Sequence, residues 1–144
     1  MGGPRKGSRS RRASGSGAAA LLAAVLLVGC TPATQPDPAL RALAGDALSA
    51  TRAAELGIRL AGEDRILVTT ERALLDDMAE DLADTARELQ LYQPATAVDG
   101  ELRLSLLEVT RGAGEAVHRA QQGGADTADE LQKLGRELAQ VAEG

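Results

Sequence analysis

Apolar residues recur at steps of three and four along four stretches between residues 38 and 142. This spacing places side chains on one face of a helix, so each stretch is predicted to form an amphipathic α-helix. The four apolar stripes are Leu40, Leu43, Ala47, Ala54, Ile58 and Ala61; Leu75, Met78, Leu82, Leu89 and Tyr92; Leu102, Leu106, Val109, Ala113, Ala116 or Val117, and Ala120; and Leu131, Leu134, Leu138 and Val141.

Local signals predict where the first two helices begin and end. Asp37 is a preferred N-cap residue, and Pro38 suits the first position of a helix. Gly62 is expected just past the end of the first helix. The stretch Glu63–Thr70 is ambiguous, because Ile66–Thr70 is rich in β-branched residues; without a partner strand it is interpreted as the first turns of the second helix. Pro94 then ends that helix.

The last two helices have signals of the same kind. Asp99 is expected to cap the third helix, and Gly123 and Gly124 form a turn after it. Inside the third helix, Gly112–Gly114 allows either a close helix contact or a kink. Thr127 and Glu130 match a capping box at the start of the fourth helix.

Short connections between helices favour antiparallel neighbours. The sequence therefore predicts an all-α fold, an up-down-up-down antiparallel four-helix bundle over residues 38–144. Leu82 and Leu106 are expected to be buried near the middle of the second and third helices.

The chain upstream of the bundle has the pattern of a secretory signal peptide. Five basic residues and no acidic one lie within residues 1–17, and the uncharged apolar run Ala18–Val28 follows. A basic segment, an apolar segment of about 7–15 residues and a small residue before the cleavage site define such a signal. The run is too short for a membrane span, which needs about 20 residues.

Leu27-Val28-Gly29-Cys30 resembles the lipobox of bacterial lipoprotein precursors. The resemblance implies that a diacylglyceryl group is joined to the Cys30 thiol and that signal peptidase cuts between Gly29 and Cys30. Two acyl chains anchor a protein stably, whereas one binds only marginally. Residues 1–29 would then be removed, residues 30–37 would form a lipidated tether, and the domain would face outward from the cell membrane. Ser10–Arg12 also resembles a twin-arginine export signal, but the apolar residues expected after it are absent.

Charge limits the partners. Removing residues 1–29 takes away five basic residues and changes the formal net charge from −5 to about −10. A domain this acidic is repelled by phosphate backbones, so no nucleic-acid partner is expected. Cys30 is the only cysteine and Tyr92 the only aromatic residue.

Two motifs suggest metal binding, and neither is complete. A dense cluster of six acidic residues lies on the second helix, but no loop supplies converging oxygens, so they are expected to form a solvated face. The residues are Asp76, Asp77, Glu80, Asp81, Asp84 and Glu88. Glu115 and His118 have the spacing of a di-iron motif, which requires a second histidine; His118 is the only one. No metal, cofactor or catalytic residue is predicted.

Two hypotheses of function follow. The first is a lipid-anchored, non-enzymatic interaction or scaffold domain of the cell envelope, and the alternative is a carrier or sensor of a small ligand or metal inside the bundle. The domain itself resembles no named functional family. An envelope protein partner would contact apolar residues outside the main stripes. The candidates are Leu67, Val68, Leu104 and Leu107.

Overall fold

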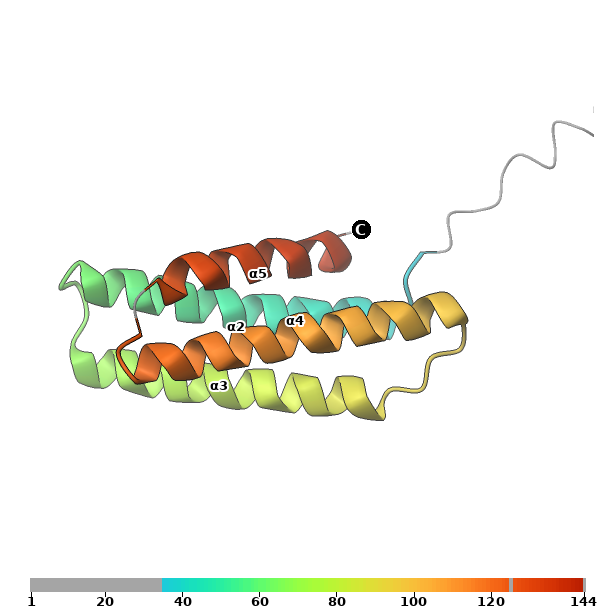
Figure 1. Ribbon diagram of the computed structural model, residues 1–144, viewed down its shortest axis with the longest axis horizontal. Coiled ribbons are helices and arrows are strands. Elements are labelled where there is room, and N and C mark those ends of the chain that lie inside the picture. The colour runs from blue at the N-terminus through green and yellow to red at the C-terminus, as the bar shows by residue number, and fades with distance from the viewer. Residues whose placement is uncertain (1–34, 125, 144) are drawn as a thin grey trace, which may run out of the picture. The chain divides into compact units, whose positions relative to one another are not determined.

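The computed structural model describes residues 35–124 and 126–143. These residues form four helices: α2 (Pro38–Gly62), α3 (Val68–Leu91), α4 (Ala97–Gln121) and α5 (Thr127–Ala142). Short loops join consecutive helices, which run antiparallel (Figure 1). The predicted all-α four-helix bundle is confirmed.

The helices are arranged so that α2 contacts all three others, whereas α3 and α5 do not contact each other within the described residues. The α2–α4 diagonal is therefore the short one. Small side chains explain this, because buried alanines on both helices let their backbones approach. They are Ala44, Ala47, Ala50 and Ala54 on α2, and Ala113 and Ala116 on α4.

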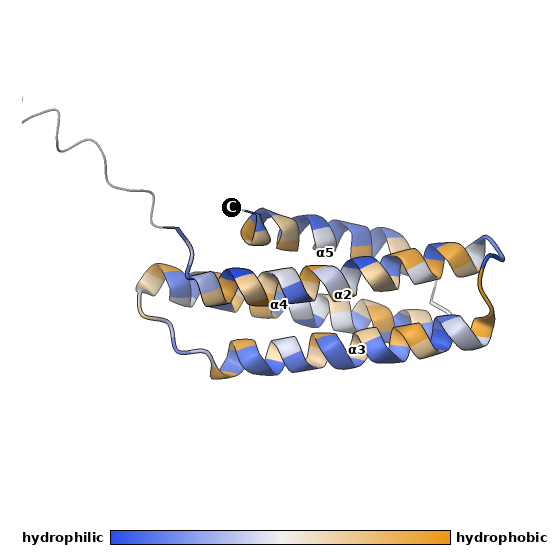
Figure 2. Ribbon diagram, turned by 180° about the vertical axis from the view of Figure 1, so that it is seen from behind, coloured by the Kyte–Doolittle hydropathy of each residue, from blue (hydrophilic) through white to orange (hydrophobic). Residues whose placement is uncertain are grey.

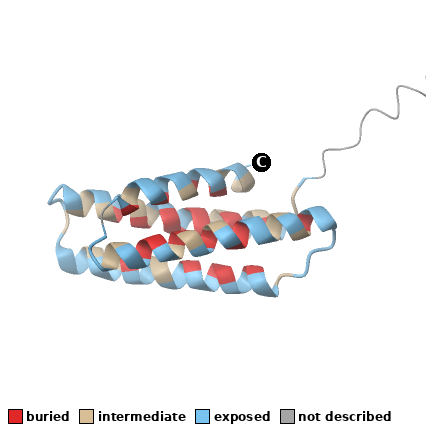
Figure 3. Ribbon diagram, viewed as in Figure 1, coloured by how far each residue is buried: buried red, intermediate tan, exposed pale blue. Residues whose placement is uncertain are grey.

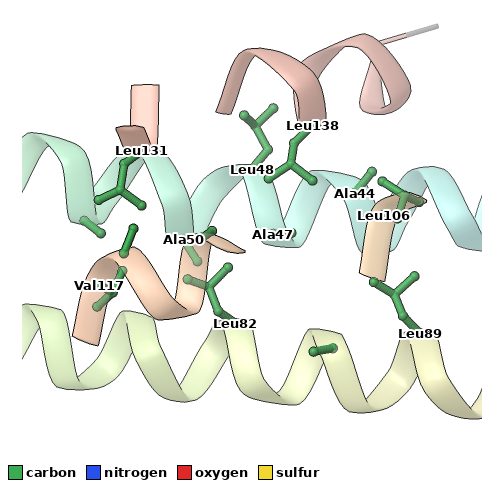
Figure 4. Close-up of a cluster of buried hydrophobic side chains, with 14 of the residues drawn as sticks. Ala44, Ala47, Leu48, Ala50, Leu82, Leu89, Leu106, Val117, Leu131 and Leu138 are labelled. Atoms are coloured by element: carbon green, nitrogen blue, oxygen red, sulfur yellow. The ribbon is translucent and has the colours of Figure 1, made fainter. Parts of the chain in front are cut away.

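Leucines from the other faces complete the core. Leu82 and Leu106 are 1% and 2% exposed, which confirms that both are buried. The close-up shows Leu82 of α3 pointing towards Ala50 of α2, and Leu138 of α5 beside Leu48 (Figure 4). Buried residues lie on the inward faces and exposed residues on the outer ones (Figure 3), and polar and apolar residues alternate along every helix (Figure 2).

The α2–α3 connection differs from the prediction. Residues 63–67 form a loop, and α3 begins only at Val68. The reason is a Schellman motif, in which the N–H groups of Asp64 and Arg65 donate to the carbonyl oxygens of Ala61 and Leu60, at 3.0 and 2.8 Å. Asp64, with φ of 55°, takes the left-handed position predicted for Gly62, and Gly62 is instead the last helical residue.

The third helix begins three residues earlier than predicted. Its N-cap is Thr96, whose side chain accepts a hydrogen bond from the N–H of Asp99 at 3.1 Å. Asp99 occupies the third helical position, where a carboxylate favours the positive end of the helix dipole. The helix then continues unbroken through Gly112, where a Cβ atom would meet Leu134 of α5 at 3.7 Å.

The turn after α4 is as predicted, but the start of α5 is not. The N–H groups of Gly123 and Gly124 donate to carbonyl oxygens of Ala120 and Arg119, and Gly123 has φ of 80°. Thr127 is the first residue of α5, and its hydroxyl donates to the carbonyl of Gly124. The predicted capping box is therefore absent, because the Glu130 carboxylate accepts instead from Arg119.

Candidate functional site

The predicted lipidation and cleavage residues, Gly29 and Cys30, lie outside the described residues, as does the predicted signal peptide. Among the helices that are described, none combines the length and apolar character required to cross a membrane.

Three of the four residues proposed for partner contact are exposed. Leu67, Val68 and Leu104 are 74%, 72% and 56% exposed. Leu107 is only 8% exposed, so its prediction as a surface residue is wrong. The buried face of α4 is wider than one stripe, because α4 packs against α2, α3 and α5 together.

The exposed residues do not form one patch. Val68 lines a hollow with Ala120 and Gln121, near the end of α4, whereas Leu104 lies in the first third of the same helix. At about 1.5 Å per residue, Leu104 and Ala120 are separated by about 24 Å along the axis. The candidate contact residues therefore lie at two separate places. Leu67 and Val68 are at the start of α3, and Leu104 is on a face of α4, called the α4 face below.

The α4 face is an open hollow on one side of the helix. Its lining residues recur once per helical turn: Leu104, then Leu107 and Glu108, then Arg111 and Gly112, then Glu115. Because Gly112 faces Leu134, this side of α4 is directed towards α5. Helix α5 contacts α2 more extensively than α4, which leaves the α4 side open.

The length of α5 adds to this opening. It has 16 residues where α4 has 25. Leu138, four residues before the end of α5, lies beside Leu48 of α2 (Figure 4). At about 1.5 Å per residue, α2 continues for about 15 Å from Leu48 to Pro38, whereas α5 has only about 6 Å left. The beginnings of α2 and α4 therefore extend past the end of α5 (Figure 1).

The six clustered acidic residues of α3 form a solvated face, as predicted, because all six are exposed. Asp81, Asp84 and Glu88 border a hollow between α3 and α2, together with Asp46. Asp84 also pairs with Arg87. Among the described residues, no group of three or more histidine, cysteine or acidic side chains could hold a metal ion.

His118 is exposed, and its Nδ1 lies 2.9 Å from the side-chain oxygen of Gln121. The amide nitrogen of Gln121 donates in turn to Asp76 of α3, at 2.8 Å. Glu115 is also exposed. Glu115 and His118, which were predicted not to form a complete metal motif, therefore lie on the surface. Gln121 connects α4 to α3, and His118 contacts the oxygen of its side chain.

The sequence did not reveal a polar junction at the other end of the bundle. The Asp99 carboxylate accepts from the Thr96 hydroxyl at 2.6 Å and from the Asp37 N–H at 3.3 Å. Asp37 also caps α2, since its carboxylate accepts from the Ala39 N–H at 2.7 Å. These contacts connect the start of α2 to the start of α4. The only local signal was Asp99 itself, which resembled a simple cap.

Tyr92 completes this junction. Its pKa is raised, first by burial, then by a hydrogen bond to the Asp37 carboxylate and by the negative charges of Asp37 and Asp99. Arg103 of α4 donates to the carbonyl oxygens of Leu89 and Gln90 at 3.3 and 3.5 Å, and so covers the last turn of α3. The junction fixes the point where the chain enters the bundle.

Comparison of the chain with protein-family models, with curated proteins and with solved structures finds no match.

Proposed function

We propose that the protein is a lipid-anchored lipoprotein of the bacterial cell envelope. The observation that supports this most is the sequence Leu27-Val28-Gly29-Cys30, which follows a basic segment and an uncharged apolar run in the order of a lipoprotein signal. Cys30 would carry the diacylglyceryl group and become the first residue of the mature chain. The domain would then be held at the outer face of the membrane.

Within this proposal the helical domain binds another envelope protein and performs no catalysis. The support is the open hollow on α4, where the exposed Leu104 lies beside Glu108 and Arg111. An exposed apolar side chain can anchor a partner at the centre of an interface. The acidic and basic side chains beside it can form hydrogen bonds at the rim. The net charge of about −10 makes nucleic acid an unfavourable partner.

Anchoring is tested by the intact mass of protein extracted from membranes. We expect a chain that begins at Cys30 and carries a diacylglyceryl addition. The Cys30→Ser variant, which removes the thiol nucleophile, should not be lipidated or cut at this site. A free thiol at Cys30 in the membrane-extracted protein would contradict the proposal.

Partner binding is tested separately, with a photoreactive amino acid in place of Leu104 in the full chain. Leu56 of α2 is the matched control, because it is 58% exposed where Leu104 is 56% exposed. We expect a discrete crosslinked envelope protein from position 104 and none from position 56. Equal crosslinking at both positions would mean that the α4 face has no specific role.

A further inference from the structure

We propose that the end of the bundle formed by the α3–α4 loop rests on the lipid surface, with Leu91 and Val98 in contact with the membrane. This inference deepens the proposed anchoring and rests on it. It names the lipid surface as a direct partner of the folded domain, in addition to the acyl chains on Cys30.

The first observation is where the chain leaves the bundle. The Asp37 N–H donates to Asp99 near the start of α4, so the segment that leads back to Cys30 starts at this end. Pro36 is half-buried, and six peptide units separate it from Cys30. At no more than about 3.6 Å per residue, these units span at most about 22 Å. The α3–α4 loop therefore lies at the end of the bundle from which the segment towards the proposed anchor departs.

The second observation is the absence of charge in the loop at this end. Leu89–Val98 is ten residues long and contains no charged residue, which makes it the longest such run between residues 35 and 144. The opposite end carries Glu63, Asp64 and Arg65 in the α2–α3 loop. An acidic domain is repelled by anionic lipid headgroups, so the end with the uncharged loop is the one that can approach a membrane.

The third observation is the exposure of apolar side chains within this run. Leu91 is 73% and Val98 61% exposed, at the last residue of α3 and the second residue of α4. Both helices therefore present an apolar side chain at the same end of the bundle. Of the nearest charged residues along the chain, Asp99 is buried and hydrogen-bonded, whereas Glu88 is exposed one turn before Leu91.

The geometry at this end also limits how the loop can move. Arg103 holds the last turn of α3, and Thr96 and Asp99 hold the first turn of α4. The loop between them is thus fixed at both ends. Contact with lipid at Leu91 and Val98 would orient the whole bundle, with α5 and the α2–α3 loop further from the membrane.

The experiment uses the full-length, lipidated protein, purified from membranes and reconstituted in phosphatidylcholine vesicles with brominated acyl chains. The chain has no tryptophan, so a single introduced one reports on its own position. The test variant is Leu91→Trp, and the matched control is Leu67→Trp at the opposite end, because the two leucines are 73% and 74% exposed. Circular dichroism checks that both variants fold.

We expect the fluorescence of Trp at position 91 to shift to shorter wavelength and to be quenched by brominated lipid. Trp at position 67 should keep the emission it has in water. Absence of quenching at position 91, in protein that co-floats with vesicles, would overturn the inference, and quenching at both positions would overturn the upright orientation. If the emission of Trp at position 91 shifts to shorter wavelength in cell envelopes but not in pure lipid vesicles, this end contacts a protein partner and the inference is overturned.

The two proposals fail in different ways. If the protein does not co-float with vesicles and has no acyl group at Cys30, the anchoring itself is wrong. If it is lipidated and co-floats but position 91 stays in water, only the contact between the bundle end and the lipid is wrong.

Discussion

The backbone N–H of Asp37 donates a hydrogen bond to the carboxylate of Asp99, 62 residues further along the chain. Asp37 caps α2 and Asp99 lies in the first turn of α4, so this contact joins the starts of the two helices that form the short diagonal of the bundle. Asp99 is 8% exposed, and its carboxylate also accepts from Thr96. Its negative charge is thus held by two donors.

Replacing Asp99 with alanine should destabilise the domain. The change leaves the Asp37 N–H and the Thr96 hydroxyl without their acceptor. Each hydrogen bond to a charged group contributes about 1.5–3 kcal/mol to stability. We expect the free energy of unfolding in urea to fall by about 2 kcal/mol. Glu101→Ala is the control, because Glu101 is exposed on the same helix. A similar loss in both variants would show that the junction is not specific.

The same junction predicts an alkaline titration. The pKa of Tyr92 is raised above its ordinary value of 10.0, so the folded state favours the neutral phenol. The associated stability is fully present below pH 10 and is lost as the pH rises through the pKa of the folded state. Because Tyr92 is the only tyrosine and the chain has no tryptophan, ultraviolet absorbance follows this one group.

The contribution of Asp37 to that pKa can be separated by Asp37→Asn. Asparagine is also a good N-cap, so α2 keeps its start while the charge is removed. We expect the pKa of Tyr92 to fall but to stay above 10, since burial is the larger cause. Asp46→Asn, on an exposed position of α2, should leave it unchanged. No change with Asp37→Asn would contradict the proposed contact.

Leu82→Ala tests how much the core depends on its few large side chains. Leu82 is 1% exposed and packs where the opposing α2 face is alanine, so few other large side chains can fill the space it leaves. We expect a loss of about 2–5 kcal/mol in the free energy of unfolding. Leu56→Ala is the control, since Leu56 is 58% exposed. An equally small loss in both variants would mean that the α3 stripe is rotated away from the core.

The fold could be predicted because four apolar stripes of helical period require four helices that bury them. What could not be predicted depends on partners far away in the sequence. Leu107 is buried although it lies outside the main stripe, because three helices surround α4. Asp99 was recognised as a capping residue, but nothing near it in the sequence indicates that Asp37 binds it.

Helix ends were missed for a more local reason. Gly62 looked like the residue just past α2, since glycine has no Cβ to clash in the left-handed region. Asp64 takes that position instead, as aspartate tolerates positive φ better than most residues do. Several candidates within one turn of each other cannot be ranked by residue type alone. The lipidation site lies outside the described residues and remains a sequence prediction.

Two glycines of α2 should respond differently to alanine. Glycine in a helix interior costs about 1 kcal/mol relative to alanine. A Cβ at Gly45 meets nothing within 4 Å, so Gly45→Ala should raise the free energy of unfolding by about that amount. At Gly57 a Cβ would lie 2.6 Å from Cδ2 of Leu74, so the Leu74 side chain must shift. Chemical denaturation should therefore show a smaller gain, or a loss, for Gly57→Ala; equal gains would show that Leu74 moves freely.

Two buried threonines provide the last test. The Thr51 hydroxyl donates to the Ala47 carbonyl at 2.7 Å, whereas the Thr110 hydroxyl is buried with no hydrogen-bond partner among the described residues. A buried polar group without a partner costs about 1–3 kcal/mol, and valine has the same shape without the hydroxyl. Thr110→Val should therefore raise the free energy of unfolding by about 1 kcal/mol. Thr51→Val removes a hydrogen bond. Its free energy of unfolding should therefore rise by less than that of Thr110→Val, or fall. If thermal and urea unfolding give the same change for both variants, the Thr110 hydroxyl has a partner in solution, such as the carbonyl of Leu106 one turn earlier.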